Sequence, residues 1–117
     1  MANHSLSRRE NMCKTLTVLI PRFYNPDTSG NRKEVEQSKL ELTESEIRNL
    51  FEGYTVHSCI GWDGVTRVED SHFRFEMDIS KRAATLDRLR QWRKILEQRF
   101  RQAKIYMKIS RAPVLWL

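Results

Sequence analysis

Side chains that could do acid–base or nucleophilic chemistry occur at alternate positions in two segments, residues 54–60 and 72–79. Alternation with a period of two is typical of a β-strand, which would carry these side chains on one face of a sheet. Histidines and carboxylates could transfer protons there, and a cysteine two residues from a histidine could act as a nucleophile. The candidates on this polar sheet face are His57, Cys59, His72, Arg74, Glu76 and Tyr106.

The same pattern has a simpler interpretation, because an antiparallel sheet with one solvent-facing side alternates polar and apolar residues in any case. Opposite charges on neighbouring strands also pair without any ligand. No HxH or CxxC spacing indicates a metal site, and the four glycines are scattered instead of forming a phosphate-binding loop. We therefore expect no metal, no cofactor and no catalytic residue. A small enzyme of the dimeric α/β-barrel type, using His57, His72 or Glu76, is kept as a third interpretation.

Four strands are predicted to position these residues. Apolar and polar residues alternate over residues 14–20, 54–60, 72–79 and 105–109, as in half-buried strands. The third of these segments has the clearest pattern, because a shift of one residue would move every apolar side chain to the other face. The side chains that we expect in the core from this segment are Phe73, Phe75, Met77 and Ile79.

Two helices are predicted between the strands. Thr43 and Glu46 have the spacing of a capping box, so a short helix is expected to begin at Thr43 and to end at Gly53. A longer helix is expected over about residues 81–102, where apolar residues recur every three or four positions. Its predicted buried stripe consists of Leu86, Leu89, Trp92, Leu96, Phe100 and Ala103.

The resulting element order, β-α-β-β-α-β, is that of the ferredoxin-like split βαβ arrangement. We predict an α+β domain with a four-stranded antiparallel sheet, two helices on one face, and the first and third strands in the centre. A mobile arm over residues 1–13 is expected to precede a single domain over residues 14–117, since a chain of 117 residues suits one modest core. Residues 25–39 are expected to form a long loop.

Positive charge is concentrated in the second predicted helix. The whole chain carries +6, and residues 81–104 contain nine basic and two acidic residues. Arg90, Lys94 and Arg101 could contact phosphates, which makes a nucleic-acid-binding module the alternative function. A solvated helix face, with Glu97 paired to Arg101, explains the same residues. The acidic side chains of the polar sheet face also differ from RNA-binding sheets, which expose aromatic rings to the bases.

Four large apolar residues follow Pro113, and water is an unfavourable environment for them. We expect this segment to pack against the sheet or against a second copy of the chain. A tryptophan beside a predicted hairpin turn is a further candidate for an exposed aromatic contact. The candidate protein-contact residues are Trp62, Val114, Leu115, Trp116 and Leu117.

Together these patterns favour a small non-enzymatic protein-binding or adaptor domain that acts through its sheet face and C-terminal segment. A homodimer is the expected form of self-association, because two-fold dimers are the commonest oligomers. No apolar run approaches the roughly 18 residues of a membrane helix, and no signal-peptide core follows the polar N-terminus, so a cytoplasmic protein without membrane association is expected. Cys13 and Cys59 would then be thiols, although spacing alone leaves a disulfide between them open.

Overall fold

The chain folds into a single layer of strands covered by two helices. The computed structural model describes residues 10–51, 53–62, 67–79 and 85–115, with the backbone alone at 10–13, 59–62, 67–71 and 112–115. In chain order the elements are β1 (Glu10–Pro21), α2 (Gln37–Leu50), β2 (Tyr54–Trp62), β3 (Arg67–Asp78), α3 (Leu86–Arg99) and β4 (Met107–Leu115).

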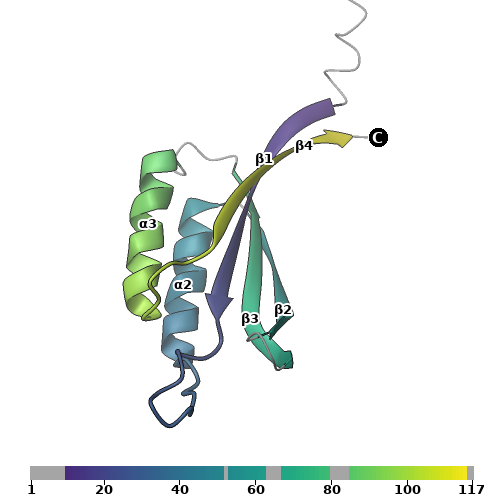
Figure 1. Ribbon diagram of the computed structural model, residues 1–117. Coiled ribbons are helices and arrows are strands. Elements are labelled where there is room, and N and C mark those ends of the chain that lie inside the picture. Colours follow the sequence, from purple (N-terminus) through teal and green to yellow (C-terminus); the bar gives the residue numbers. More distant parts are fainter. Residues whose placement is uncertain (1–9, 52, 63–66, 80–84, 116–117) are drawn as a thin grey trace, which may run out of the picture.

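The four strands form one antiparallel sheet in the order β2-β3-β1-β4. The predicted α+β class is confirmed, and β1 and β3 occupy the centre of the sheet. Both helices lie on the same face of the sheet, and the other face has no helix over it (Figure 1). The strands β2 and β4 form the two edges.

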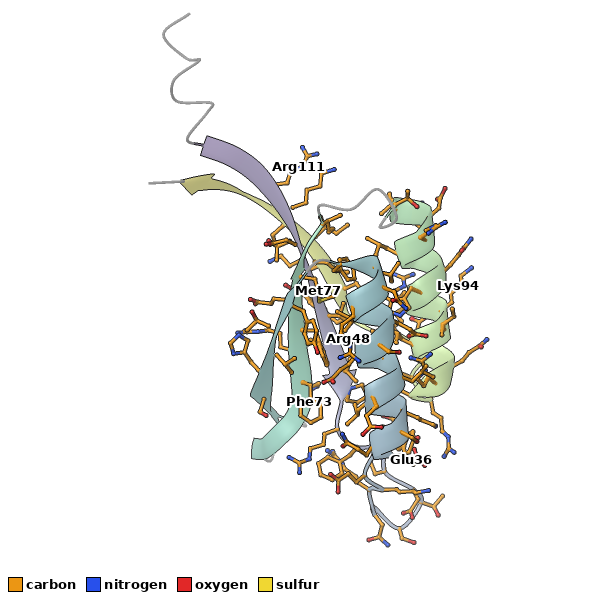
Figure 2. All side chains as sticks on the ribbon, turned by 180° about the vertical axis from the view of Figure 1, so that it is seen from behind. Glu36, Arg48, Phe73, Met77, Lys94 and Arg111 are labelled. Atoms are coloured by element: carbon orange, nitrogen blue, oxygen red, sulfur yellow. The ribbon has the colours of Figure 1, made fainter. Side chains whose placement is uncertain are left out.

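The alternation of β3 was predicted correctly. Phe75 lies opposite Val18 and Met77 lies opposite Leu16, and all four side chains are buried beneath the helices. Figure 2 shows Phe73 and Met77 on the helix side of β3. The helices complete this core with their own apolar stripes, which include Ile47, Leu89, Trp92, Leu96 and Phe100.

The central strand β1 and the edge strand β4 are both longer than the alternating pattern predicted. Their pairing runs from Val18 opposite Met107 to Glu10 opposite Leu115, so β1 begins before the expected boundary at residue 14. The β1–β3 pairing, in contrast, ends at Thr15 opposite Asp78. Residues 10–14 and 111–115 therefore form a two-stranded extension, the β1–β4 ribbon, which projects beyond the rest of the sheet (Figure 1). Of the arm predicted over residues 1–13, residues 1–9 lie outside the described residues.

The helix α2 begins six residues earlier than predicted, and the proposed capping box is wrong. Thr43 lies in the middle of α2, where its buried hydroxyl donates to the carbonyl oxygen of Lys39 at 2.8 Å. Glu46 contacts α3 instead of the helix start. The helix ends at Leu50 with an extended Phe51 after it, and Gly53 has no left-handed backbone angle. A local motif was overruled here by contacts made across the fold.

The early start of α2 shortens the loop predicted over residues 25–39. Backbone bonds join its two sides, because Tyr24 N donates to Lys33 O and Val35 N donates to Arg22 O, both at 2.8 Å. At the tip, the carboxylate of Asp27 accepts from the backbone N–H groups of residues 29 and 31 at 2.8 and 2.9 Å. The segment is thus a closed turn attached to the base of α2.

The helix α3 is shorter than predicted. Thr85 caps its start by accepting from the N–H of Arg88 at 3.3 Å. Arg101, at φ 53°, adopts a left-handed conformation and directs the chain away from the helix axis. The predicted stripe is correct in its middle, but Leu86 and Ala103 at its two ends are exposed.

Candidate functional site

The polar sheet face was the first candidate, and the strand register places the side chains of His57, His72, Arg74 and Glu76 on the face without helices. Strand register sets Arg74 opposite His57 on β2 and opposite Leu19 on β1. The Nε atom of Arg74 lies 3.3 Å from Oε1 of Glu76, an ion pair without hydrogen-bond geometry. Tyr106 is exposed beside Leu19. The two charges therefore pair, while the buried Nε–H of Arg74 makes no hydrogen bond to another described residue.

His72 is half-buried on this face, and burial lowers its pKa below the ordinary value for histidine. Its backbone lies opposite Cys59 on one side and Pro21 on the other. The side chain of Cys59 lies outside the described residues, so the His57–Cys59 pair stays a prediction.

The same register separates the two cysteines. Cys13 lies on β1, and Cys59 lies on β2 with β3 between them. Cys59 lies opposite His72 on β3, and His72 lies opposite Pro21 on β1. Pro21 is about 27 Å along β1 from Cys13, at roughly 3.4 Å per residue. A disulfide needs Cα atoms within about 7 Å, so these two cysteines cannot pair in this fold.

The three basic candidates do not share one helix face. Arg90 pairs with Asp87 at 3.7 Å, and Lys94 points away from the body of the molecule (Figure 2). Arg101 lies beyond the helix end, with its guanidinium carbon 4.5 Å from the ring centroid of Tyr24. The predicted Glu97–Arg101 pair is wrong, since Glu97 instead accepts from the backbone N–H of residue 105 at 3.0 Å.

The C-terminal candidates are only partly described. Val114 and Leu115 belong to β4, where they pair with residues 11 and 10 of β1. Trp62 ends β2 opposite Arg67. The side chains of these three residues, and the whole of Trp116 and Leu117, lie outside the described residues.

A clamp between the two helices was not foreseen from the sequence. The guanidinium of Arg99 makes two bonds of 2.7 Å to the carboxylate of Glu46, and one of them comes from a nitrogen that also donates to Thr43 at 2.8 Å. The indole N–H of Trp92 donates to the same carboxylate at 3.0 Å. Burial acts to raise the pKa of Glu46, but the hydrogen bonds from Arg99 and Trp92 outweigh burial and lower it. No local sequence signal connects residues 46 and 99, because they meet only in the folded state.

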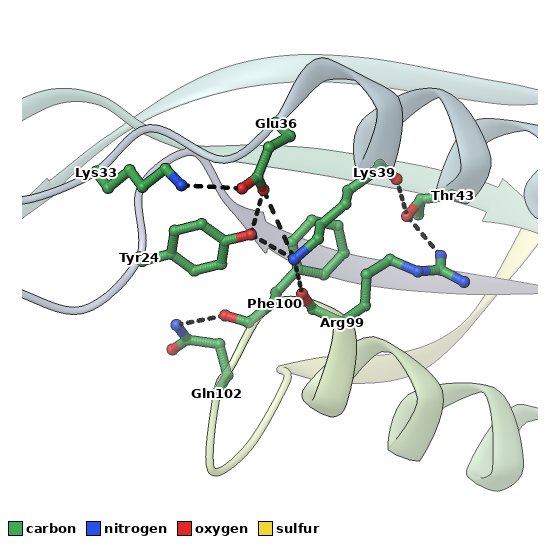
Figure 3. A network of polar contacts seen from close by, with 8 residues as sticks. All are labelled: Tyr24, Lys33, Glu36, Lys39, Thr43, Arg99, Phe100 and Gln102. Atoms are coloured by element: carbon green, nitrogen blue, oxygen red, sulfur yellow. Dashed lines mark hydrogen bonds and ion pairs between the residues drawn. The ribbon is translucent and has the colours of Figure 1, made fainter.

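A second network fixes the C-terminal end of α3 to the loop and to α2 (Figure 3). The ammonium of Lys39 donates to the hydroxyl of Tyr24 at 2.6 Å and to the carbonyl oxygen of Arg99 at 3.0 Å. The Tyr24 hydroxyl donates to Glu36, and this bond is the main reason that the pKa of Glu36 falls to about 2. The Lys39 cation, bound to the carbonyl oxygen of the last residue of α3, is also well placed for the helix dipole.

An apolar surface lies at the other end of α3, facing the edge strand β4. Two shallow hollows adjoin there, and both are lined by Leu86, Leu89 and Ile109. Leu86 is 52% exposed and Ile109 is 43% exposed, so two large apolar side chains face solvent side by side. We call this surface the α3–β4 groove, and its apolar floor consists of Leu16, Ile79, Leu86, Leu89, Met107 and Ile109.

The rim of the α3–β4 groove is basic. Arg90 and Arg93 of α3 line one hollow, and Lys14 and Arg111 at the base of the ribbon line the other. Figure 2 shows Arg111 extending from the ribbon on the side where α3 begins. Asp87 lies 3.7 Å from Arg90, and Glu97 lies 3.9 Å from Arg93, so these two cations are partly neutralised. The described residues that line the hollows include no acidic side chain.

Comparisons with known proteins add no identity to this surface: no family model, curated protein or solved structure matches the chain. Among the residues that the structure describes, no three histidine, cysteine or acidic side chains gather where they could hold a metal ion. Within the same ranges, no helix has the length and apolar character needed to cross a bilayer.

Proposed function

We propose that the chain is a small protein-binding domain whose binding surface is the α3–β4 groove. The observation that carries this proposal is the pair of exposed apolar side chains, Leu86 and Ile109, within the apolar floor of this groove. Apolar surface rimmed by polar groups typically marks an interaction site. The sequence-based proposal of a non-enzymatic adaptor is thus kept. It named the sheet face and the C-terminal segment as contact surfaces, and we now favour the sheet edge at β4.

The size of the hollows favours a protein over a small molecule. Their volumes are about 140 and 270 Å³. Small-molecule sites are usually clefts of roughly 300–1,000 Å³ that enclose most of their ligand. Two open hollows that share Leu86, Leu89 and Ile109 as lining residues instead suit the side chains of a docked polypeptide.

Fold and location are part of the same proposal. The element order and the strand order β2-β3-β1-β4 support assignment to the ferredoxin-like arrangement. Such sheets host many functions, so the assignment carries no function by itself. The separation of the two cysteines supports a cytoplasmic location, where thiols persist. Self-association through the C-terminal segment stays a prediction.

The test is selection of peptides from a random display library on the purified domain. Ile109→Asp places a charge on the groove floor, and Val56→Asp provides a matched control on the opposite edge strand, where Val56 is 38% exposed. We expect selected peptides to bind the wild type and the control alike, and to bind Ile109→Asp about tenfold or more weakly, as for a residue central to an interface. Circular dichroism verifies that both variants fold. If no peptide is enriched, or if enriched peptides bind Ile109→Asp as well as the wild type, the proposal is wrong.

A further inference from the structure

Along the outer edge of β4, backbone N–H and C=O groups point away from the sheet. Leu19 N donates to Tyr106 O at 3.1 Å, and the register sets Val18 opposite Met107. Since hydrogen-bonding direction alternates along an antiparallel strand, residues 106, 108 and 110 direct their N–H and C=O groups toward β1. Met107, Ile109 and Arg111 therefore direct theirs away from the sheet. Pro113 continues the outward series and has no N–H, which ends the edge there.

The same three residues line the α3–β4 groove with their side chains. One edge thus combines outward backbone donors and acceptors with an apolar floor on the helix side. A strand that paired with this edge would place every second side chain over the groove, because side chains alternate across a strand. This combination is the basis of recognition by strand addition, in which backbone bonds provide affinity and alternate pockets provide specificity.

We propose that the α3–β4 groove binds an extended acidic segment of a partner protein, which adds a fifth strand beside β4. This inference rests on the proposed function and specifies its partner. The segment places an apolar side chain over Leu86 and Ile109, and an acidic side chain two residues to either side of it. One acidic side chain faces Arg90 and Arg93, and the other faces Lys14 and Arg111.

Charge decides between this partner and a second copy of the chain. Pairing β4 with its own copy around Ile109 would bring the Arg111 of each copy toward the Arg90 and Arg93 of the other. Like charges across paired strands are destabilising. Asp87 and Glu97 reduce the repulsion but already face Arg90 and Arg93 in the same chain. An acidic strand meets the four cations without this conflict.

The experiment uses short blocked peptides and the isotopically labelled domain in solution. The test peptide is Ser-Glu-Thr-Val-Thr-Glu-Ser, and a second peptide has lysine in place of both glutamates. A third peptide is N-methylated at the valine and at both threonines, which removes the central backbone donors that face β4 in either strand direction without changing charge. We expect the acidic peptide to bind about tenfold more tightly than the lysine peptide, with the difference decreasing as salt is added. The amides of Ile109 and Arg111 should exchange with solvent more slowly in the complex.

Two variants locate the charge effect. Arg111→Glu should weaken binding of the acidic peptide by about fivefold and strengthen binding of the lysine peptide, because it reverses the charge on one side of the rim. Lys108→Glu is the control, since Lys108 is exposed on the same strand but faces the other side of the sheet. Lys108→Glu should change binding of the acidic peptide by less than half as much as Arg111→Glu does.

Each remaining outcome overturns the inference in a distinguishable way. Equal binding of the lysine or N-methylated peptide would show that acidity or strand pairing is not required. Failure of all three peptides, while display-selected peptides still depend on Ile109, would leave a protein-binding groove with a different ligand. A dimer of the wild type that Ile109→Asp dissociates would assign the edge to a second copy. Failure of both experiments would remove the proposed function as well.

Discussion

The two ends of α3 are attached to the fold in different ways. At its C-terminal end, Arg99 is held by Glu46 and Thr43, while Lys39 binds the carbonyl oxygen of Arg99 and Phe100 is fully buried. At its N-terminal end, a single cap from Thr85 precedes an exposed Leu86. The stabilising polar contacts of α3 are thus concentrated away from the α3–β4 groove. The exposed groove residues Leu86 and Ile109 can therefore change, or contact a ligand, at little cost to the fold, whereas Leu16 and Leu89 beneath them belong to the buried core.

The largest expected difference between the two ends is in packing. Phe100→Ala should lower the free energy of unfolding by about 3–5 kcal/mol, because a fully buried aromatic ring leaves a cavity. Leu86→Ala should lower it by less than about 1 kcal/mol, since half of that side chain already faces water. Urea denaturation of both variants measures the two values. Similar losses would show that the two ends are equally important for stability.

A smaller effect is expected from the helix clamp. Glu46→Gln should lower the free energy of unfolding by about 2–4 kcal/mol. This is below the upper end for a buried ion pair, because the side chain of Glu46 is 26% exposed and that of Arg99 is 10% exposed. Glu41→Gln on the exposed side of α2 should cost less than about 0.5 kcal/mol. The double variant with Glu46→Leu and Arg99→Met should lose less than Glu46→Gln, since it leaves no unpaired charge. A double variant less stable than the single one would contradict this account.

The smallest effect concerns pH, because Glu36 is solvent-accessible. The pKa of Glu36 falls from 4.5 to about 2 in the folded state, and the hydrogen bond from Tyr24 is the largest cause, followed by a backbone hydrogen bond and by Lys33 and Lys39. The ionised carboxylate therefore adds stability above about pH 4.5, and this contribution is lost as the pH falls toward 2. Tyr24→Phe removes the main cause of the shift. We expect the melting temperatures of wild type and variant to converge between pH 4.5 and 2, and a constant difference would rule out the assigned bond.

Local patterns predicted those parts of the fold that depend on neighbours in sequence. The alternation in β3 placed Phe75 and Met77 in the core correctly, because a strand with one buried face specifies its own register. The capping box failed because Thr43 and Glu46 are used by contacts with α3, which no spacing within α2 records. The predicted start of β1 was wrong for the same reason, since β1 extends to Glu10 only where β4 pairs with it.

The candidate site was the least predictable part. Leu86 was expected in the core and is exposed, because α3 starts beside the sheet edge and has no further element over its first turn among the described residues. Arg101 was placed with the helical cations, but the left-handed turn directs it to Tyr24. Lys14, Arg93 and Arg111 form one surface only because of the strand order. The sequence pattern indicated that order, but it did not show that these residues surround a groove.

The pairing of β1 with β4 has a consequence for the order in which the molecule folds. Val18 and Met107 are about 90 residues apart in the chain, whereas β2 and β3 are joined by a short connection. Closing the longer loop costs roughly 2–3 kcal/mol more in chain entropy. We expect the β2–β3 hairpin to form early and β4 to dock last, as in other proteins with long-range strand pairing. The binding edge then appears only at the final step of folding, so intermediates that lack β4 cannot capture the partner prematurely.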